Sequence, residues 1–422
     1  MRTVELVGSI GEMMLQKRIL VEADNNTWPN PGPPHFPVTF PVAPASYQLN
    51  VLSMLMVLGY ITTPINALGI SLSEHWAWVR YVNAIANNDY LQITSAFAQL
   101  DAHQKTILSD DFGVALPITW LVDSLGVSEI CDGAYFALNL AHRHSATVKG
   151  GGKRGPAKRP DFVCKDASGL WHVVECKGTQ GSEATRERQL YHQLPNGTPN
   201  GAKIQKSMIT FNGPSAGQRL GTGLLIGIEG SGKNSSLKII DPESRKPFII
   251  TDKMMSDTDD PMIRSAAGRA LNALGLPTAA TSFTSPHGMI EREVFRGKEF
   301  SYLFPQDEQI KRRDAIANEE LDAAISRKTV SIRGASYIVR EQSILLPAPA
   351  YLTGKPIKRA RIRFFLEKDT LDRIKKSKFT ENPIHGKDDD WDKSRKGIFF
   401  SGDDRSGQLS IGEMFLAEMD VR

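Results

Sequence analysis

The sequence predicts an α/β fold (α+β overall), in which a mainly helical N-terminal region precedes a strand-rich middle region and a mixed α/β C-terminal region. Helix signals dominate the first 127 residues, two short apolar runs around a glycine-containing turn mark the middle region, and helices and strands are mixed after residue 257. A chain of 422 residues with 41% hydrophobic residues is long enough to bury the cores of two or three domains. We therefore divide the chain into residues 1–127, 128–256 and 257–422.

Composition argues against several classes of protein. The longest apolar run, 49–61, contains Asn50, Ser53 and Gly59 and is too short to cross a bilayer, so we expect a buried helix there. Early acidic residues and the lack of a long apolar core at the N-terminus argue against a cleaved signal peptide. The three cysteines show no CxxC spacing, which disfavours a disulfide framework and a structural zinc site. We expect a cytoplasmic protein that has no membrane partner.

Charge is distributed unevenly along the chain. The net charge is +4, but the residues up to Gly150 hold 7 Lys and Arg against 12 Asp and Glu, whereas the remainder holds 44 against 35. Basic residues therefore concentrate in a part of the chain where a polyanion such as nucleic acid would bind. Ordinary scatter of charge is the alternative explanation.

Helix signals fill most of the N-terminal region. The proline-rich segment 27–44 is the exception, and we expect it to be a loop or an extended linker. Helices are expected over 71–87, 90–108, part of 114–125 and 128–144, with caps at Ser71 and Ser128 and with Pro117 in a first turn.

The remainder of the chain mixes strands and helices. After a basic, glycine-rich loop (149–159), strand-like sequence extends from Asp161 to Lys177. Further helices are expected over 182–194, 202–209, 261–274 and 306–327, and further strands over 222–228, 237–240, 248–251 and 357–366. The polar segment 257–261 is a candidate domain boundary.

The strand-like segment is predicted to form a β-hairpin that brings two acidic residues together. Its apolar runs flank Asp166-Ala-Ser-Gly169, which is typical of a three-residue hairpin loop with Gly169 in the left-handed conformation. If Asp166 pairs with Leu170, then Asp161 lies opposite Glu175. The Cβ atoms of directly opposed residues are roughly 5 Å apart.

A lysine on the same strand joins the two acids. Side chains alternate along a strand, so Glu175 and Lys177 share one face while Cys176 points to the other. Two close carboxylates repel each other unless a proton or a cation lies between them. Magnesium suits a sparse carboxylate site beside a phosphate, where it acidifies a bound water molecule. Lys177 would then hold the attacking water or stabilise the developing charge, whereas an ordinary charged surface hairpin is the alternative.

Pro160-Asp161 followed by Glu175-Cys176-Lys177 resembles the PD-(D/E)xK motif of the restriction-endonuclease-like nuclease superfamily. The separation of the two parts by one hairpin and the glycine that follows Lys177 add to this resemblance. It implies a restriction-endonuclease-like αβββαβ core, one or two Mg²⁺ ions, for which Mn²⁺ would substitute, and hydrolysis of phosphodiester bonds. It also implies that Asp161 and Glu175 are catalytic metal ligands and that Lys177 is the catalytic residue that positions water or stabilises charge.

The superfamily also places an acidic residue on the helix before the sheet. Glu129 is the first candidate for this additional metal ligand and Asp132 the second, because both lie on the helix expected to begin at Ser128. A solvated acid near a helix N-terminus is the alternative for either residue. The sequence departs from the superfamily upstream, where a glycine-rich loop occupies the place of the first strand. That strand is expected to be short (146–149) or displaced.

Two groups of basic residues are candidates for binding nucleic acid through its phosphates. One group lies on the loop that leads directly into Asp161, and its members are Lys153, Arg154, Lys158 and Arg159. The other shares one face of the expected strand 357–366, and its members are Arg359, Arg361 and Arg363. For the second group, a solvated strand face or an edge guarded by charge is the alternative.

The segment 227–234 (GIEGSGKN) nearly fits the phosphate-binding P-loop pattern. Asn234 replaces the hydroxyl residue that would hold magnesium, and 237–241 is expected to be a returning strand in place of the required helix. A glycine-rich hairpin turn is therefore favoured over a P-loop nucleotidase.

The sequence thus favours the hypothesis of a magnesium-dependent endonuclease that acts on DNA. By analogy alone, chains of this design occur in prokaryotic restriction, phage-defence or mobile-element systems. A non-catalytic nucleic-acid-binding or assembly subunit on a nuclease-like fold is the alternative, although the complete motif argues against it. Because cutting both strands of a duplex often calls for two active sites, a homodimer or partner subunits of a larger system are expected.

Overall fold

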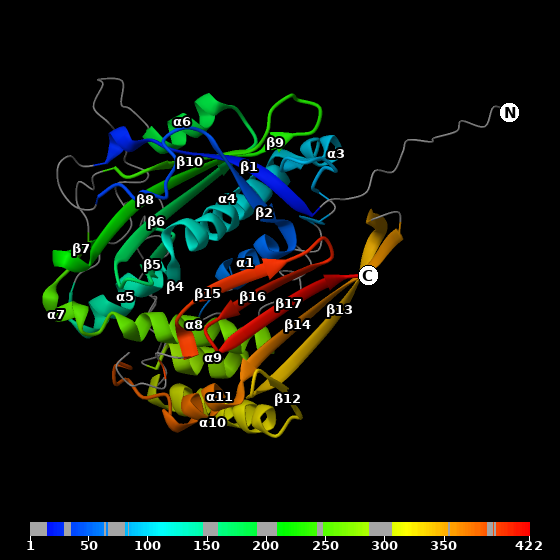
Figure 1. Cartoon of the computed structure of the whole chain (residues 1–422). Helices are drawn as coiled ribbons and strands as arrows, with labels where there is room; N and C mark the ends of the chain where they lie inside the picture. The colour runs from blue at the N-terminus through cyan, green and yellow to red at the C-terminus, as the bar shows by residue number, and fades with distance from the viewer. Residues whose placement is uncertain are drawn as a thin grey trace.

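The computed structural model describes residues 15–28, 35–62, 65, 81–82, 84–146, 159–191, 209–242, 248–286, 306–352, 355–385, 391 and 394–422. These residues form a mixed α/β structure built on two large β-sheets (Figure 1). Helices from both halves of the chain pack against the sheets. The α/β fold class expected from the sequence is therefore confirmed in this general form.

The larger sheet has seven strands and contains the predicted hairpin. Its spatial order is β2-β1-β10-β8-β6-β5-β4. The strands are β1 (Gln16–Ala23), β2 (Ala45–Asn50), β4 (Val127–Asp132), β5 (Phe162–Asp166), β6 (Trp171–Thr179), β8 (Ala216–Leu225) and β10 (Ser236–Ile240). The pairs β6–β8 and β1–β10 are parallel and the other neighbours are antiparallel. Because β6 is covered on both faces, its first four residues form a continuous buried run.

Helices cover both faces of this sheet beside β6. The helices of this half of the chain are α1 (Val51–Thr62), α3 (Ser95–Ala98), α4 (Ala102–Leu125), α5 (Gly133–Arg143) and α6 (Glu183–Tyr191). Gly178 of β6 lies against the backbone of α4, whereas Gly223 of β8 lies against Leu190 of α6. Gly223 pairs with Lys177 and therefore faces away from Gly178. At this level α4 and α6 lie on opposite faces.

The second sheet is antiparallel throughout and comes from the C-terminal part of the chain. In spatial order its strands are β12 (Thr329–Ile332), β13 (Ala335–Leu352), β14 (Lys355–Glu367), β17 (Phe415–Val421), β16 (Ser406–Ile411) and β15 (Ile398–Gly402). Every second residue of β17 is buried, which is typical of a sheet with one face on a core. The accompanying helices are α7 (Asp252–Met255), α8 (Asp259–Leu274), α9 (Pro277–Thr284), α10 (Gln306–Ile325) and α11 (Lys368–Lys376).

The glycine-rich segment 227–234 forms a turn. It begins with β9 (Gly227–Ile228), which pairs with β3 (Gln92–Ile93), and it turns through Gly230 and Gly232 at φ +77° and +72°. The chain then returns as β10, antiparallel to β8, without an intervening helix. The interpretation as a hairpin turn is confirmed, because this segment lacks the helix that a P-loop requires after its glycines.

Four short elements complete the secondary structure that is described by name. β7 (Ile209–Phe211) and β11 (Phe248–Ile250) form a parallel pair. Single turns of 3-10 helix occur at η1 (Asn25–Thr27) and η2 (Gly213–Ser215). In the described part of the proline-rich segment, residues 35–44 form neither helix nor strand, as expected for a loop.

Two fully buried arginines fix α8 to both halves of the chain. Arg269 donates to the backbone carbonyl of Ile130 on β4 at 3.3 Å. Arg264 donates to the carboxylate of Asp260 at 2.8 Å and to the backbone carbonyl of Thr380 at 3.0 Å. A buried charge is tolerated when such partners surround it. These contacts therefore hold α8 between the larger sheet and the C-terminal part of the chain.

Most of the expected elements are confirmed where the structure describes them. Helices α1, α6, α8 and α10 occur near the expected 49–61, 182–194, 261–274 and 306–327. Strands β8, β10, β11 and β14 occur near the expected 222–228, 237–240, 248–251 and 357–366. The helices expected over 71–87 and 202–209 fall largely outside the described residues, as does most of the loop 149–159.

The expectation of separate helices over 90–108 and 114–125 is wrong. A single helix, α4, spans most of both segments, and the residues before it form β3 and α3. Asp101 caps α4 by accepting hydrogen bonds from the backbone N–H groups of His103 and Gln104. Pro117 lies inside the helix, and Gly126 ends it with a φ of +67°.

The helix expected to begin at Ser128 is also a misassignment. Residues 127–132 form strand β4, and the helix that follows, α5, begins only at Gly133. The residue that caps α5 is Asp132, whose carboxylate accepts the N–H of Tyr135 at 2.8 Å. The first strand of the antiparallel group is therefore β4, which precedes α5, so it is displaced, as one of the two alternatives had it. The other position, 146–149, lies almost wholly outside the described residues. Both Glu129 and Asp132 consequently lie on a strand.

Strands from both sides of the predicted division at 127/128 belong to one sheet. Strands β1 and β2 from the N-terminal region belong to the same sheet as β4 to β10, and α4 packs on β6. The polar segment 257–261 likewise leads into α8 and is not an open linker. The first two predicted regions therefore share one sheet.

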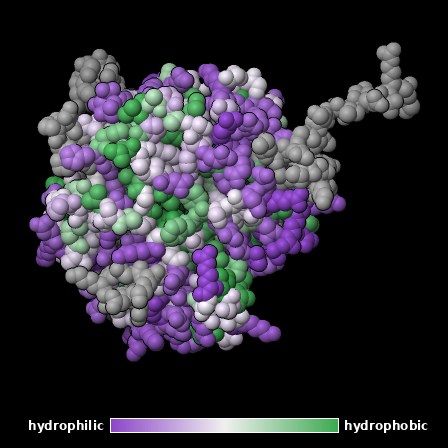
Figure 2. Space-filling model, in the orientation of Figure 1, coloured by the Kyte–Doolittle hydropathy of each residue, from purple (hydrophilic) through white to green (hydrophobic). Residues whose placement is uncertain are grey.

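The length and apolar character of the described helices, and the hydropathy of one face of the molecule, can be compared with what a membrane-spanning protein requires. Among the helices that the structure describes, none combines the length and the apolar character needed to cross a bilayer. Figure 2 shows one face of the molecule, on which hydrophilic residues are widespread and hydrophobic residues appear between them in patches. Isolated apolar groups of this kind are normal on a protein surface.

Candidate active site

The predicted hairpin register is confirmed. Phe162 pairs with Val174 and Lys165 with Trp171, so the register places Asp161 opposite Glu175. Gly169 has a φ of +90°, the left-handed conformation that the turn requires.

The side chain of Asp166 locks this turn. Its carboxylate accepts hydrogen bonds from the hydroxyl of Ser168 and from the backbone N–H of Leu170, and it lies 3.1 Å from Nε2 of His172. Burial alone would raise the pKa of Asp166, but the partners His172, Ser168 and Leu170 outweigh it and lower the pKa to about 2. The charged carboxylate therefore fixes the hairpin from which the candidate site extends.

The structure brings Asp161, Glu175 and Lys177 together at the other end of the hairpin. Lys177 donates through Nζ to Oε1 of Glu175 at 2.5 Å and to the backbone carbonyl of Cys176 at 2.9 Å. Oδ2 of Asp161 accepts the backbone N–H of Cys176 at 2.6 Å. Glu175 is 6% exposed, and its second oxygen, Oε2, is buried without a hydrogen-bond partner among the described residues.

The pKa of each of these three groups depends on the charge of at least one of the other two. Burial, followed by the negative charge of Asp161, raises the pKa of Glu175 to about 7, although Lys177 opposes this shift. Burial also raises the pKa of Asp161, against the opposing effects of Lys177 and the N–H of Cys176. Burial would lower the pKa of Lys177, but Glu175 and Asp161 outweigh it and raise the pKa. The lysine therefore keeps its proton, and one ammonium group faces two buried carboxyl groups.

A contact between two glycines places helix α4 beside this cluster. A Cβ atom on Gly178 would lie 1.7 Å from the carbonyl oxygen of Ser109, and one on Gly113 would lie 2.6 Å from the nitrogen of Gly178. Any larger residue at either position would separate α4 from β6. The glycine that follows Lys177 in the sequence motif is therefore required by the packing of a helix backbone on a strand backbone.

This close approach adds Asp110 to the site, which the sequence analysis missed. Burial raises the pKa of Asp110, and the charge of Lys177 opposes that shift. The charge of Asp110 in turn contributes to the raised pKa of Asp161. The signal that would have found it is Gly113, one turn farther along a single helix that the sequence analysis had split in two.

Asp132, the second candidate for the upstream acid, lies close to Asp161. The backbone N–H of Gly133 donates to the backbone carbonyl of Asp161 at 3.0 Å, and the charge of Asp132 helps to raise the pKa of Asp161. The carboxylate of Asp132 already caps α5 through one oxygen. It therefore contributes negative charge to the site while serving as a helix cap.

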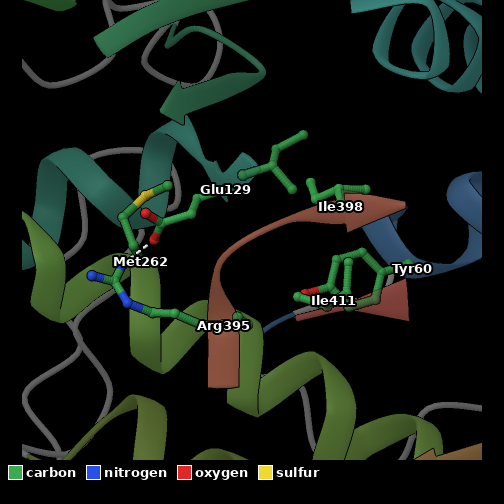
Figure 3. A pocket seen from close by; sticks show the side chains of 8 residues that line it. Tyr60, Glu129, Met262, Arg395, Ile398 and Ile411 are labelled. Carbon is green, nitrogen blue, oxygen red and sulfur yellow. Dashed lines mark hydrogen bonds and ion pairs between the residues drawn. The ribbon is translucent and has the colours of Figure 1, made fainter. Parts of the chain in front are cut away.

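Glu129, the first candidate for the upstream acid, lies elsewhere. It is opposite Lys165 on the β4–β5 ladder, 5% exposed, and forms a buried ion pair with Arg395 (Figure 3). The pair lines a small pocket together with Tyr60, Met262, Ile398 and Ile411, which Figure 3 shows around it. Burial raises the pKa of Glu129. Its assignment to a helix is therefore wrong, because it lies on β4 and joins that strand to the segment before β15.

Cys176 faces the core, as predicted from strand alternation. It is 4% exposed and belongs to the same apolar cluster as Phe112 and Leu116 of α4. Burial raises the pKa of its thiol well above the ordinary value, which further suppresses the reactive thiolate.

We expect native Cys176 to react slowly with thiol reagents and Cys176→Ala to lower stability, by about 1–2 kcal/mol, more than it lowers activity. Timed labelling in native buffer and in denaturant, with peptide mapping of the modified cysteine, measures the first effect. Cys131 and Cys164 are also buried and serve as internal references. Rapid native labelling of Cys176 would mean that the strand register, and with it the site, is wrong.

The basic loop is described only at its end. Lys153, Arg154 and Lys158 lie outside the described residues, and Arg159 is half-buried two residues before Asp161. Contact of this loop with phosphates therefore stays a prediction that rests on its covalent connection to Asp161.

The three arginines of β14 differ in their surroundings. Arg361 binds Asp420 at 2.8 Å, and Arg363 binds Glu418 at 2.6 Å, both across the ladder to β17. Arg359 is exposed to solvent. Because an acid on β17 neutralises each of Arg361 and Arg363, these two residues fit the alternative of a solvated, charged strand face. Contact of all three with successive phosphates stays a prediction.

Asp161 and Glu175 are the acids of the candidate site that are available to a divalent cation. In the part of the chain that the structure describes, no group of three or more His, Cys, Asp or Glu side chains is placed to hold a metal ion. The candidate site instead offers two acids, Asp161 and Glu175, and the buried, unpartnered Oε2 of Glu175. Magnesium is bound by one or two carboxylates and keeps several water ligands, so these residues fit it.

Comparison with known proteins gives no relative. No protein-family model, curated protein or solved structure matches this chain.

Proposed function

We propose that this protein is a metal-dependent endonuclease that hydrolyses phosphodiester bonds in DNA, with Asp161, Glu175 and Lys177 as its catalytic centre. The observation that carries the proposal is the convergence of these three side chains, with a buried carboxylate oxygen of Glu175 that has no hydrogen-bond partner among the described residues. An unsatisfied buried carboxylate oxygen destabilises the fold, and a bound cation would remove that cost.

The order of elements around the cluster supports the same proposal. In chain order, α4 precedes β4, α5 lies between β4 and β5, and α6 and the short strand β7 follow β6 before β8, which pairs with β6 in parallel. With α5 and β7 set aside as insertions, this order matches the αβββαβ core that the resemblance to the PD-(D/E)xK superfamily implies. Asp110 on α4 also occupies the kind of position that the resemblance gives to an additional acid, on the helix before the sheet.

Each residue has a role that follows from its position. Asp161 and Glu175 would hold one Mg²⁺ ion, which on binding lowers the pKa of a water ligand and neutralises charge on the scissile phosphate. Lys177 keeps its proton beside Glu175, so it acts as a donor that orients the attacking water or stabilises charge developing on phosphate oxygens. The N–H of Cys176 fixes Asp161 in the direction of the cluster.

Cleavage should depend on a divalent cation, because the paired acids have no other means of activating water against a phosphodiester. We expect cleavage of plasmid DNA with Mg²⁺ or Mn²⁺, at most binding without cleavage with Ca²⁺, and none in excess EDTA. Full activity in EDTA would contradict the proposal. Restoration of activity by adding back Mg²⁺ to the EDTA-treated protein is the control for irreversible loss of fold.

By analogy alone, we extend the proposal to a role in a prokaryotic restriction, phage-defence or mobile-element system. In such a system the protein would act as a homodimer or with partner subunits. A non-catalytic DNA-binding or assembly subunit is distinguished by the same assay, since it would bind DNA without cleaving it under any metal condition.

A further inference from the structure

Strands β13 and β14 extend beyond the sheet to which they belong. The pairing of β14 with β17 covers 360–366, and Arg422 forms the last bonds of that ladder with Lys358 and Arg359. Farther out, among the described residues, β13 and β14 pair with each other alone, from Ala350 opposite Ile357 to Leu352 opposite Lys355. Figure 1 shows this ribbon projecting past the body of the molecule beside the C-terminus. We call residues 345–352 and 355–359 the arm.

The arm and the part of β14 at its base contain basic residues but no acidic residues. From Ser343 to Leu366 the sequence contains five Lys and Arg and no Asp or Glu. The two inner arginines of this stretch, Arg361 and Arg363, are matched by Asp420 and Glu418 on β17. The positive charge that β17 leaves unmatched therefore belongs to the arm.

Two consecutive residues at the base of the arm are exposed to solvent. Successive side chains on a strand point to opposite faces of the sheet. Lys358 and Arg359 are both exposed, whereas Ile357 and Ala360 on either side of them are buried. Leu345, which pairs with Arg359 on the opposite strand, is 64% exposed. Lys358 and Arg359 therefore reach solvent on opposite faces of the strand, although the residues next to them are buried.

We infer that the arm binds in the major groove of double-stranded DNA, with Lys358 and Arg359 contacting the flanking phosphates. The major groove of B-form DNA, about 12 Å wide, admits a two-stranded β-ribbon. Residues 355–359 of β14 reach roughly 15 Å at about 3.3 Å per residue, which is enough to cross the groove. A-form RNA has a deep, narrow major groove that does not admit such a ribbon.

The charge pattern selects DNA over a second copy of this chain as the partner. A second copy of this chain carries a net charge of +4 and would repel a basic ribbon overall, whereas phosphates are neutralised by each Lys and Arg that reaches them. The irregular register between Leu345 and Ala350 adds a local twist, which suits a ribbon that follows a curved groove. The inference rests on the proposed function only in its choice of DNA as the ligand.

The test is a titration of the full chain against a 25-base-pair DNA duplex in Ca²⁺ buffer, at several salt concentrations. The arm variant carries Lys358→Gln and Arg359→Gln together. The matched control carries Lys311→Gln and Arg312→Gln, which remove the same charge from two exposed positions on α10. We expect several-fold weaker binding by the arm variant, and a slope of log affinity against log salt flatter by roughly 1.8, or 0.9 for each lost contact. The control should change neither the affinity measured at fixed salt nor the slope by a comparable amount.

Equal losses in both variants, or an unchanged slope in the arm variant, would overturn the inference. A change in oligomeric state of the arm variant without a change in DNA binding would identify a second copy as the partner and overturn it as well. Equal affinity for duplex RNA would show that binding does not depend on the wide major groove of DNA, and would also overturn the inference. Because binding is measured without cleavage, failure of the arm is distinguishable from failure of the nuclease proposal, which is scored separately as cleavage by the wild type in Mg²⁺.

Discussion

Replacing Glu175 by glutamine should abolish cleavage while leaving the protein folded. The substitution keeps the shape of the side chain but removes the charge that would bind the cation, and Asp161→Asn should act in the same way. We expect activity on plasmid DNA to fall by roughly 10³-fold or more, which corresponds to about 4 kcal/mol of lost transition-state stabilisation. Glu183→Gln, at an exposed position on α6 only eight residues away, is the matched control and should cleave normally.

The same substitution should raise stability when no metal is present. The pKa of Glu175 is about 7 in the folded protein against an ordinary value of 4.5, so folding favours its protonated form. This contribution to stability is present below pH 4.5 and is lost as the pH rises to about 7. Glu175→Gln avoids the loss, so its advantage over the wild type should be absent at pH 4.5 and reach the order of 1–3 kcal/mol above pH 7.

Thermal melts in EDTA at pH 4.5, 6 and 8, recorded side by side for the wild type and Glu175→Gln, measure this effect. If Glu175→Gln instead loses its folded circular-dichroism spectrum, the hairpin is a structural element and the catalytic interpretation of Glu175 loses its basis. An equal change in stability at all three pH values would show that Glu175 titrates normally in the folded protein.

Gly178→Ala should damage both stability and activity, because the added methyl group has no room. Its Cβ atom would lie 1.7 Å from the backbone carbonyl oxygen of Ser109, and a backbone atom cannot move aside as a flexible side chain does. Helix α4 must therefore shift away from β6, which changes the position of Asp110 relative to Lys177. We expect a loss of stability of about 3 kcal/mol, at the upper end of overpacking effects, and a loss of activity of at least tenfold.

The adjacent loop provides a control for this prediction. A Cβ atom on Gly181 would approach only side-chain atoms of Thr179 and Thr185, at 3.2 Å, so Gly181→Ala should change stability by less than about 1 kcal/mol. Denaturant unfolding and plasmid cleavage are measured on both variants. Wild-type stability and activity in Gly178→Ala would show that α4 does not lie against β6 as described here.

The hairpin was predictable because all of its determinants are local. Asp166, the left-handed Gly169 and the alternation of apolar residues lie within a few residues of one another, and together they fix the register of Asp161 against Glu175. The orientation of Cys176 toward the core follows from the same register. The sequence therefore contained the three side chains of the candidate centre and their relative positions.

The surroundings of the centre depend on contacts between distant parts of the chain, which the sequence pattern did not show. Ser128 looked like a helix cap, but its segment pairs with β5 more than 30 residues later, and the true cap is Asp132. Glu129 is neutralised by Arg395, 266 residues away. Asp110 entered the site through the packing of Gly113 on Gly178, which a break placed inside α4 had concealed. Each of these errors arose where tertiary packing overrode a local signal.

The most direct test of the catalytic centre is incubation of supercoiled plasmid with Mg²⁺ and equal amounts of wild type or Lys177→Ala, purified in the same way. Lys177→Ala removes the ammonium group from the cluster and leaves both carboxylates in place. We expect the wild type to convert the plasmid to nicked and linear forms and the variant to leave it supercoiled, with both proteins folded by circular dichroism. Equal cleavage by the two proteins, or no cleavage by the wild type, would contradict the assignment of this site as a nuclease centre.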